Sequence, residues 1–141
     1  MKFALGFALL AAVASGVKIG DDDNLQFNVQ TTQEGKKGKE CHKDDEATVQ
    51  YTGKFKDGSV FDTSVGNPEG PLKFSLGQGQ VIKCWDAAFM QMAIGEKATL
   101  TCPPSVAYGE KGAGDKIPPN TTLFFDVEVI NCEPASDFWS H

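Results

Sequence analysis

Apolar and polar residues alternate along several short stretches of this chain, and a period of two is typical of β-strands with one buried face. The pattern predicts strands at residues 25–29, 47–55, 72–76, 97–102 and 122–130. Asp57-Gly58, a strong hairpin signal, follows the second of these stretches. Val60-Phe61 then begins a return strand, which a Gly- and Pro-rich segment interrupts before residue 72. We therefore expect five strands, one of them split in two.

One stretch has the period of a helix instead. Ile82, Trp85, Phe89 and Met92 recur at helical spacing and form one apolar face, and Gly95 ends the pattern. A single short helix cannot cover both faces of a sheet, so the sheet should be antiparallel with one face covered. The fold class expected from the pattern is therefore α+β.

A long segment rich in Gly and Pro separates the last two predicted strands. It begins at Pro103-Pro104, which ends a strand because proline has no amide hydrogen to donate, and it runs to Asn120. Ordered loops of this length are uncommon in compact domains and often carry function. We therefore expect functional residues in this loop.

The N-terminus has the pattern of a secretory signal peptide. Lys2 precedes an apolar run at residues 3–13, and Ala12-Val13-Ala14 offers a small-x-small cleavage motif before Ser15. The run is shorter than the about 20 apolar residues that cross a bilayer, and no other run in the chain approaches that length. We therefore expect a signal peptide at residues 1–16, rather than a short core helix, and no membrane span.

A signal peptide would divide the chain into several parts. Residues 17–24 are polar and acidic and are predicted to be a disordered mature N-terminus. A single domain would occupy residues 25–134, and residues 135–141 would form a C-terminal tail. The tail carries no Lys-Asp-Glu-Leu type retrieval signal. The pattern therefore indicates the secretory pathway, and it leaves open whether the protein stays in the endoplasmic reticulum lumen or is secreted.

The charge balance argues against one class of partner. The chain has 19 acidic and 13 basic residues, a formal net charge of −6, and no Arg. Nucleic-acid binding depends on neutralising phosphates with Lys and Arg, so we expect no nucleic-acid partner. The acidity is interpreted as a solubility property.

The four cysteines, Cys41, Cys84, Cys102 and Cys132, are an even number in a chain with a predicted signal peptide. This favours two disulfides, for which three pairings are possible, over free buried thiols. The sequence has no Cys-x-x-Cys pair and its histidines are isolated, so we expect no metal site. We expect no cofactor either.

Five short motifs narrow the interpretation. They are, in order, Tyr51-Thr52-Gly53, Phe61-Asp62, Val81-Ile82 with Trp85, Ala107-Tyr108-Gly109, and Ile117-Pro118-Pro119 with Phe125-Asp126-Val127. Each motif is weak alone, but in this order and spacing they resemble the FKBP-type peptidyl-prolyl cis–trans isomerases over residues 41–133. The resemblance implies a monomer with an FKBP-like curved five-stranded antiparallel sheet wrapped around one short helix. It also implies an enzyme that needs no nucleophile, metal or cofactor.

The resemblance further implies a dry aromatic cleft that binds proline. Trp85 would form its floor, and the Tyr108 hydroxyl and the Ile82 amide would donate hydrogen bonds into it. Asp62 would accept a hydrogen bond from Tyr51. The walls would be Tyr51, Phe61, Leu72, Val81, Ile82 and Phe125, with Ile117 at the rim.

Each of these residues has a structural alternative, because apolar residues on strands and helices are most often core. The core interpretation is preferred for Phe55, Phe74, Phe89, Leu100 and Phe124. The residues interpreted as catalytic are Tyr51, Phe61, Asp62, Trp85, Tyr108 and Phe125, and those interpreted as substrate-binding are Leu72, Val81, Ile82 and Ile117. The implied partners are proline-containing polypeptides and macrolide inhibitors of the tacrolimus and rapamycin type.

Four features depart from the family pattern. Leu72 occupies a wall position that is often Phe, Lys116 replaces an apolar loop residue, and Cys84 stands where Gly is usual. The loop at residues 65–70 lacks the Arg that, in some members, pairs with the acid corresponding to Asp62. We expect these changes to alter ligand affinity and substrate preference more than the activity itself.

Two further predictions concern covalent modification. The family fold implies Cys84–Cys102 and Cys41–Cys132 as the disulfide pairs. Asn120-Thr121-Thr122 is the one N-x-Ser/Thr sequon in the chain, and a signal peptide would deliver it to the glycosylation machinery. The alternative is that Asn120 is a plain turn residue.

Two alternatives to a secretory-pathway isomerase stay open. One is a catalytically weak module that holds proline-containing peptides or macrolides in the same cleft. The other is a secreted interaction protein whose cleft is a relic. The full set of cleft residues favours catalysis over both.

Overall fold

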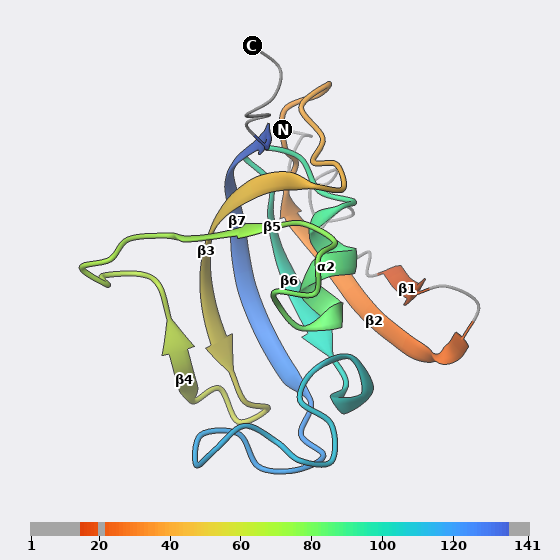
Figure 1. The fold of residues 1–141 in the computed structure, drawn as a ribbon. Helices are drawn as coiled ribbons and strands as arrows, with labels where there is room; N and C mark the ends of the chain where they lie inside the picture. The colour runs from red at the N-terminus through yellow and green to blue at the C-terminus, as the bar shows by residue number, and fades with distance from the viewer. Residues whose placement is uncertain (1–14, 20–21, 136–141) are drawn as a thin grey trace, which may run out of the picture.

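In the part of the chain that the structure describes, a curved antiparallel β-sheet packs against one short α-helix (Figure 1). The structure, a computed structural model, describes residues 15–19 and 22–135, with side chains from residue 26 onward. The strands are β1 (Ser15–Ile19), β2 (Asp22–Gln33), β3 (Asp45–Lys54), β4 (Val60–Thr63), β5 (Leu72–Ser75), β6 (Lys97–Cys102) and β7 (Leu123–Pro134). The helices are α2 (Lys83–Phe89) and the short 3-10 helix η1 (Pro104–Val106).

The strand order is β1-β2-β6-β7-β3-β4, with β5 also paired to β3, and every pairing is antiparallel. The longest ladder joins β3 to β7, from Asp45 opposite Pro134 to Lys54 opposite Phe124. β4 and β5 pair with different ends of β3, and the chain between them loops outward (Figure 1). They are the two parts of the predicted split strand, and the α+β fold class is confirmed.

The N-terminal part of the sheet differs from the prediction. The sequence predicts a disordered segment at residues 17–24, whereas the structure places Ser15–Ile19 in β1 and begins β2 at Asp22. Main-chain hydrogen bonds can form whatever the side chains are, and β1 pairs with β2 from Ser15 opposite Val29 onward. Over the described residues the sheet thus has seven strands where five were expected, because β1 is additional and the split strand counts twice. The predicted signal peptide and C-terminal tail lie almost entirely outside the described residues.

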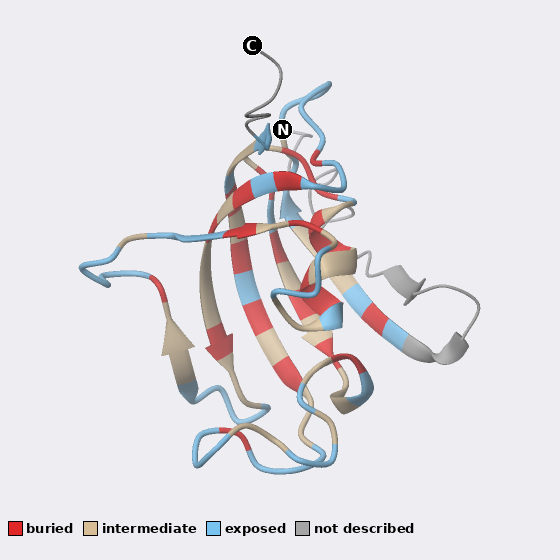
Figure 2. Ribbon diagram, in the orientation of Figure 1, coloured by how far each residue is buried: buried red, intermediate tan, exposed pale blue. Residues whose placement is uncertain are grey.

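The core lies between α2 and the inner face of the sheet. Alternate residues of β7, namely Leu123, Phe125, Val127 and Val129, are buried (Figure 2). The inward positions of β3 and β6 are buried in the same way. Phe124 was interpreted as core, but it is only half-buried. The period of two explains this correction, because it directs Phe124 to the face opposite its two neighbours.

The helix is shorter than the apolar pattern that predicted it. Ile82 is its N-cap, and Met92 is buried in the turn beyond its last residue. The buried residues of α2 are Cys84, Trp85, Ala88 and Phe89. An isolated helix of this length is not stable in water, so its packing against the sheet fixes its position.

The long loop between β6 and β7 lies at one end of the sheet and is held by its own hydrogen bonds (Figure 1). The Gly109 amide donates to the Pro104 carbonyl at 2.9 Å, and the Asn120 amide donates to the Gly109 carbonyl at 2.8 Å. Ala113 and Ile117 form an isolated antiparallel bridge farther along the loop. The loop is therefore an ordered part of the fold.

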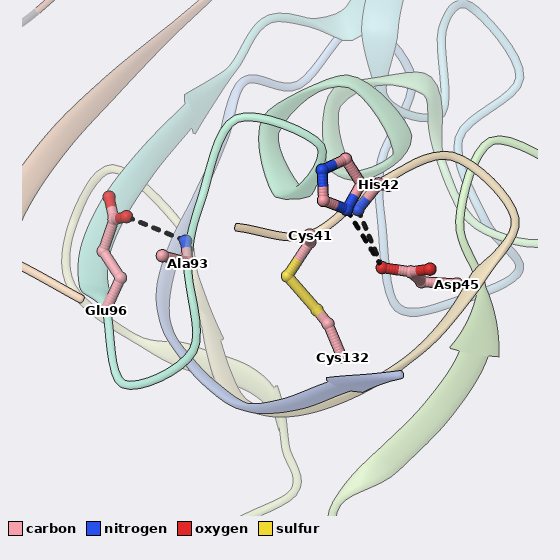
Figure 3. The surroundings of a disulfide bond; sticks show 6 residues. All are labelled: Cys41, His42, Asp45, Ala93, Glu96 and Cys132. Atoms are coloured by element: carbon pink, nitrogen blue, oxygen red, sulfur yellow. Dashed lines mark hydrogen bonds and ion pairs between the residues drawn. A yellow bond between two sulfur atoms is a disulfide. The ribbon is translucent and has the colours of Figure 1, made fainter. Parts of the chain in front are cut away.

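Both predicted disulfides are present, with the predicted pairs. Cys41–Cys132 joins the segment before β3 to the end of β7, with Cα atoms 5.5 Å apart (Figure 3). Cys84–Cys102 joins the start of α2 to the end of β6, with Cα atoms 5.9 Å apart.

Within the described residues, no helix has the length and apolar character needed to cross a membrane. The same part of the chain contains no cluster of His, Cys, Asp and Glu side chains that could hold a metal ion.

Candidate active site

A cleft of about 160 Å³ opens between the sheet, the start of α2 and the long loop. Strands β3, β4, β5 and β7 supply one side of it, and α2 with the segment before it supplies the other. The lining residues are Tyr51, Phe61, Asp62, Leu72, Gln80, Val81, Ile82, Trp85, Tyr108 and Phe125. Most of these side chains are aromatic or aliphatic, so the cleft offers an apolar surface with a few polar atoms, as small-ligand sites commonly do.

Trp85, near the start of α2, is fixed in the cleft by neighbouring rings. Its ring centroid lies 5.0 Å from that of Tyr51 and 5.2 Å from that of Phe125, both in edge-on contact. Phe89 supports it at 5.5 Å. Such edge-to-face pairs are favourable and hold rings in defined orientations. The side chain is only 5% exposed, so the cleft has a rigid aromatic base.

The indole N–H of Trp85 is buried and has no hydrogen-bond acceptor among the described residues. A buried donor left without a partner costs about 1–3 kcal/mol. Such donors are uncommon in native proteins and call for an explanation, of which a functional role is one.

A hydrogen bond joins the two strands that form one wall of the cleft. The Tyr51 hydroxyl, on β3, donates to Asp62 Oδ2, on β4, at 2.8 Å. Burial, this hydrogen bond and the negative charge of Asp62 raise the pKa of Tyr51 to about 12. Burial, with a smaller contribution from Asp62, also raises the pKa of Tyr108. Both phenols therefore keep their protons at neutral pH and serve as hydrogen-bond donors.

Gly53 allows the aromatic wall to close over β3. A Cβ atom at this position would lie 2.5 Å from Phe61 Cζ and 3.0 Å from Phe125 Cε1. Only glycine leaves room for the two rings, which meet edge-on with their centroids 5.7 Å apart. The Tyr51-Thr52-Gly53 motif thus combines a cleft side chain with the space that its neighbours need.

Two hydrogen-bond donors stand at the edge of the cleft. The Tyr108 side chain is 41% exposed and reaches the cleft from the long loop. The Ile82 amide makes no hydrogen bond within the described residues, while the Ile82 carbonyl accepts from the amides of Trp85 and Asp86. Both donors are therefore available to a bound carbonyl group.

The structure brings nine of the ten predicted site residues into this cleft, and Ile117 is the exception. Ile117 was expected at the rim, but it is only 4% exposed and packs in the core. The loop turns sharply at Gly112, with a φ of +67°, and Ala113 then pairs with Ile117. A Cβ at Gly112 would overlap the Ile117 carbonyl, so this turn depends on glycine. The turn holds the Ile117 backbone inside the loop.

Two residues that the sequence did not assign to the site lie at or beside it. Gln80 lines the cleft, and its side-chain oxygen accepts the Ser75 amide hydrogen at 2.9 Å. Its place directly before Val81 is the one signal that could have identified it. Phe55, interpreted as core, is half-buried and supports Phe61, with ring centroids 5.0 Å apart.

A wider hollow of about 610 Å³ adjoins the cleft. The two share Val81, Ile82 and Tyr108 as common walls. Residues of η1, of the long loop on either side of Tyr108 and of α2, together with Gly79, line the rest of the hollow. An extended chain bound in the cleft therefore has room to continue past Tyr108.

Known proteins resemble this chain in sequence and in fold. The family model described as FKBP-type peptidyl-prolyl cis-trans isomerase matches residues 37–130. FK506-binding protein 2 of Yarrowia lipolytica is 44% identical over 108 residues, which cover 77% of this chain and 70% of that protein. Peptidyl-prolyl cis-trans isomerase FKBP15-1 of Arabidopsis thaliana is 40% identical over 139 residues, covering 95% of this chain and 90% of that protein.

A solved structure gives the same result. The crystal structure of AtFKBP13 matches with a TM-score of 0.70 and 39% identity, and the match covers 74% of this chain and 91% of that one. Since the family match spans the whole cleft, from Tyr51 to Phe125, the chain belongs to the FKBP-type peptidyl-prolyl cis–trans isomerases.

Proposed function

We propose that this isomerase accelerates rotation about X-Pro bonds in polypeptides that fold in the secretory pathway, and that it binds the proline ring against Trp85. The observation that carries the proposal is the rigid aromatic cleft with donors at its edge. Trp85 is held edge-on by Tyr51 and Phe125, while the Ile82 amide has no partner among the described residues.

The chemistry needs an apolar surface more than a reactive group. Rotation about the prolyl peptide bond meets a barrier of about 18–20 kcal/mol, because twisting destroys the amide resonance. The twisted amide has lost C–N double-bond character and is less stabilised by water than the planar amide. A dry cleft that favours the twisted form lowers the barrier by binding the transition state more tightly than the substrate.

Fixed donors would add to this effect. The Tyr108 hydroxyl and the Ile82 amide would donate to carbonyl oxygens of the bound chain, and the raised pKa of Tyr108 keeps its proton in place. Asp62, held by the Tyr51 hydroxyl, would lie beside the carbonyl group that rotates. Donors already held in position cost no reorganisation when the bond twists.

The lining also supports a substrate preference. The walls are apolar, so apolar residues before proline should be favoured. Leu72 makes one wall less aromatic than Phe would, and it is 37% exposed. Lys116 is exposed on the long loop, where its charge would also accept an acidic residue. Macrolides such as tacrolimus, which the family binds, should occupy the same cleft.

The two disulfides support a location outside the cytosol. Disulfides persist in oxidising compartments and are rare in cytosolic proteins. Together with the predicted signal peptide, they favour the endoplasmic reticulum lumen or secretion. Expression of the full chain in eukaryotic cells, followed by fractionation and N-terminal sequencing, tests this. An uncleaved protein in the cytosol would contradict it.

We also propose that Asn120 carries an N-linked glycan in a eukaryotic secretory pathway. Its side chain is exposed, and its backbone has a φ of +54°, in a turn whose amide is bonded to Gly109, the neighbour of Tyr108. A glycan there would stand beside the cleft and restrict bulky protein clients more than short peptides. Treatment with peptide-N-glycosidase should lower the mass of the secreted protein and convert Asn120 to Asp, while a Thr122→Ala variant should show no shift. An unchanged mass would leave Asn120 as a turn residue.

An isomerase assay on the secreted protein tests the main proposal. A series of short peptides that vary the residue before proline should isomerise faster than without enzyme, and tacrolimus should abolish the gain. Trp85→Ala should lose most of the activity. Tacrolimus binding without any acceleration would favour the weak binding module instead, and neither binding nor acceleration would favour the relic cleft.

A further inference from the structure

The Cys84–Cys102 disulfide connects α2, which carries the cleft residue Trp85, to the end of β6, which does not line the cleft itself. Cys84 directly precedes Trp85 in α2, and Cys102 is the last residue of β6, from which the chain runs into the loop that carries Tyr108. Both sulfur-bearing side chains are fully buried. The bond therefore links the base of the cleft to the origin of the Tyr108 loop through the interior.

The segment from Cys102 to Tyr108 is short and internally fixed. The Val106 amide donates to the Pro103 carbonyl at 3.0 Å, and the Gly109 amide donates to the Pro104 carbonyl at 2.9 Å. These bonds fold the segment into one unit, so the place of Tyr108 depends on where Cys102 is held.

The other end of the disulfide lies in an element that needs external support. α2 has seven residues and its N-cap, Ile82, makes no side-chain capping hydrogen bond. So short a helix depends on tertiary contacts for its stability. A covalent bond at its first turn therefore restricts the position of Trp85.

We propose that Cys84–Cys102 is a positioning disulfide, which sets the distance between the Trp85 ring and Tyr108 and thereby the width of the cleft. The inference rests on the proposed role of this cleft in binding proline. Catalysis by positioning is sensitive to distance, and a misplacement of about 1 Å can cost about a hundredfold in rate. The disulfide keeps that geometry without touching the substrate.

The second disulfide provides a matched control within the same chain. Cys41–Cys132 joins the segment before β3 to the last part of β7, and none of its labelled neighbours lines the cleft (Figure 3). It closes a sequence separation of 91 residues, against 18 for Cys84–Cys102. Longer closed loops give more stabilisation in the chain-entropy account. Its loss should therefore lower the melting temperature more while leaving the cleft unchanged.

The two disulfides can be removed separately and compared. The variants are Cys84→Ala with Cys102→Ala, and Cys41→Ala with Cys132→Ala, assayed at a low temperature where far-ultraviolet circular dichroism shows both folded. We expect the first pair to lower kcat/KM for a prolyl peptide by about tenfold or more and to speed tacrolimus dissociation. We expect the Cys41→Ala, Cys132→Ala variant to stay within about twofold of wild type in kcat/KM and in the rate of tacrolimus dissociation, despite its larger fall in melting temperature.

A third variant separates the covalent bond from the volume it fills. Cys84→Ala with Cys102→Val replaces the bond by apolar packing, and it serves also if the double Ala variant fails to fold. Activity as low as in the double Ala variant, or about tenfold below wild type, supports a positioning bond. Activity restored to the wild-type value would overturn the inference, as would equal losses in the two disulfide variants. A wild-type protein that neither catalyses isomerisation nor binds tacrolimus would instead overturn the proposed function of the cleft.

Discussion

The Tyr51 hydroxyl donates a 2.8 Å hydrogen bond to Asp62 across the paired strands β3 and β4, and this contact adds to the effect of burial on the pKa of Tyr51. Burial of Tyr51, followed by the hydrogen bond and the charge of Asp62, raises its pKa from 10.0 to about 12. The folded protein therefore holds this proton more tightly than the unfolded chain does. The stability linked to it is fully present below pH 10 and is lost as the pH rises through about 12.

A Tyr51→Phe variant should reveal this linkage. It loses a hydrogen bond to a charged group, which contributes about 1.5–3 kcal/mol, and it should lose several-fold in isomerase activity. The difference in unfolding free energy between wild type and variant should be constant up to about pH 10 and shrink above it. Denaturant titrations at a series of pH values measure this difference.

The matched control is Asp62→Asn, which keeps an acceptor for the hydroxyl and removes the charge. Burial is the first cause of the raised pKa, so the alkaline loss of stability should be reduced in this background but not abolished. A loss as large as in wild type would show that the charge of Asp62 has no part in it.

Gly53→Ala should displace the Phe61 ring, which forms a wall of the cleft. The added methyl group would lie 2.5 Å from Phe61 Cζ, so the Phe61 ring must move. Overpacking of this kind costs about 1–3 kcal/mol of stability, and we expect a larger fractional loss of kcat/KM because a cleft wall is displaced. Gly58→Ala is the control: its positive φ of +90° strains the turn, yet no atom lies within 4 Å of the new Cβ. Wild-type activity in Gly53→Ala would argue against the assigned role of Phe61.

Aromatic truncations should separate cleft from core. Phe89 is fully buried, so Phe89→Ala should cost about 3–5 kcal/mol of stability. Phe61 is half-buried with one side on the cleft, so Phe61→Ala should cost less stability but more activity. Urea unfolding measures which variant loses more stability, and the isomerase assay measures which loses more activity. If Phe61→Ala lost more stability, or Phe89→Ala more activity, core and cleft would be misassigned.

The sequence predicts those parts of the fold that depend on local pattern. The strand at residues 122–130 was predicted from its β-prone composition and is confirmed by β7. Within it, a period of two fixes which side chains face inward, Phe125 among them. The same period of two places Phe124 on the opposite face. It was assigned to the core only because aromatic residues on strands are usually buried. Pairing of β1 with β2 could not be read from residues 17–24, because main-chain hydrogen bonds leave no signature in side-chain polarity.

Nine of the cleft residues were predicted from the family resemblance. The two errors, one incorrect assignment and one omission, concern residues whose position depends on how the backbone folds rather than on the local sequence. Ile117 follows a conspicuous Gly-rich segment, but whether it faces the cleft depends on the turn at Gly112. Gln80 carries no periodic or chemical signal, and only the fold brings it to the cleft. The disulfide pairs could not be deduced from the spacing of the cysteines, which allows three connectivities. The correct pairs came from the resemblance to the family fold.

Glu96 supplies a further pH test, away from the cleft. The residue is 9% exposed. Its carboxylate accepts hydrogen bonds from the Thr31 hydroxyl at 3.0 Å and from the Ala93 amide at 3.1 Å, and Figure 3 draws the second of these beside the Cys41–Cys132 disulfide. Burial raises the pKa of Glu96 above its ordinary value of 4.5, against the opposing effect of the two hydrogen bonds, and Glu34 adds to the rise. The folded state therefore binds this proton more tightly than the unfolded chain does.

The sign of the pH effect follows from that difference. Because the folded pKa is raised, the linked stability is fully present below the unfolded pKa of 4.5 and is lost as the pH rises through the folded value. Glu96→Gln can keep both contacts, with its oxygen accepting from Ala93 and its amide donating to the Thr31 hydroxyl, and it removes the titration. The stability of Glu96→Gln relative to wild type should therefore increase from about pH 4 to pH 7 in denaturant titrations. Glu34→Gln should act in the same direction with a smaller effect, and a relative stability that falls over this range would contradict the assignment.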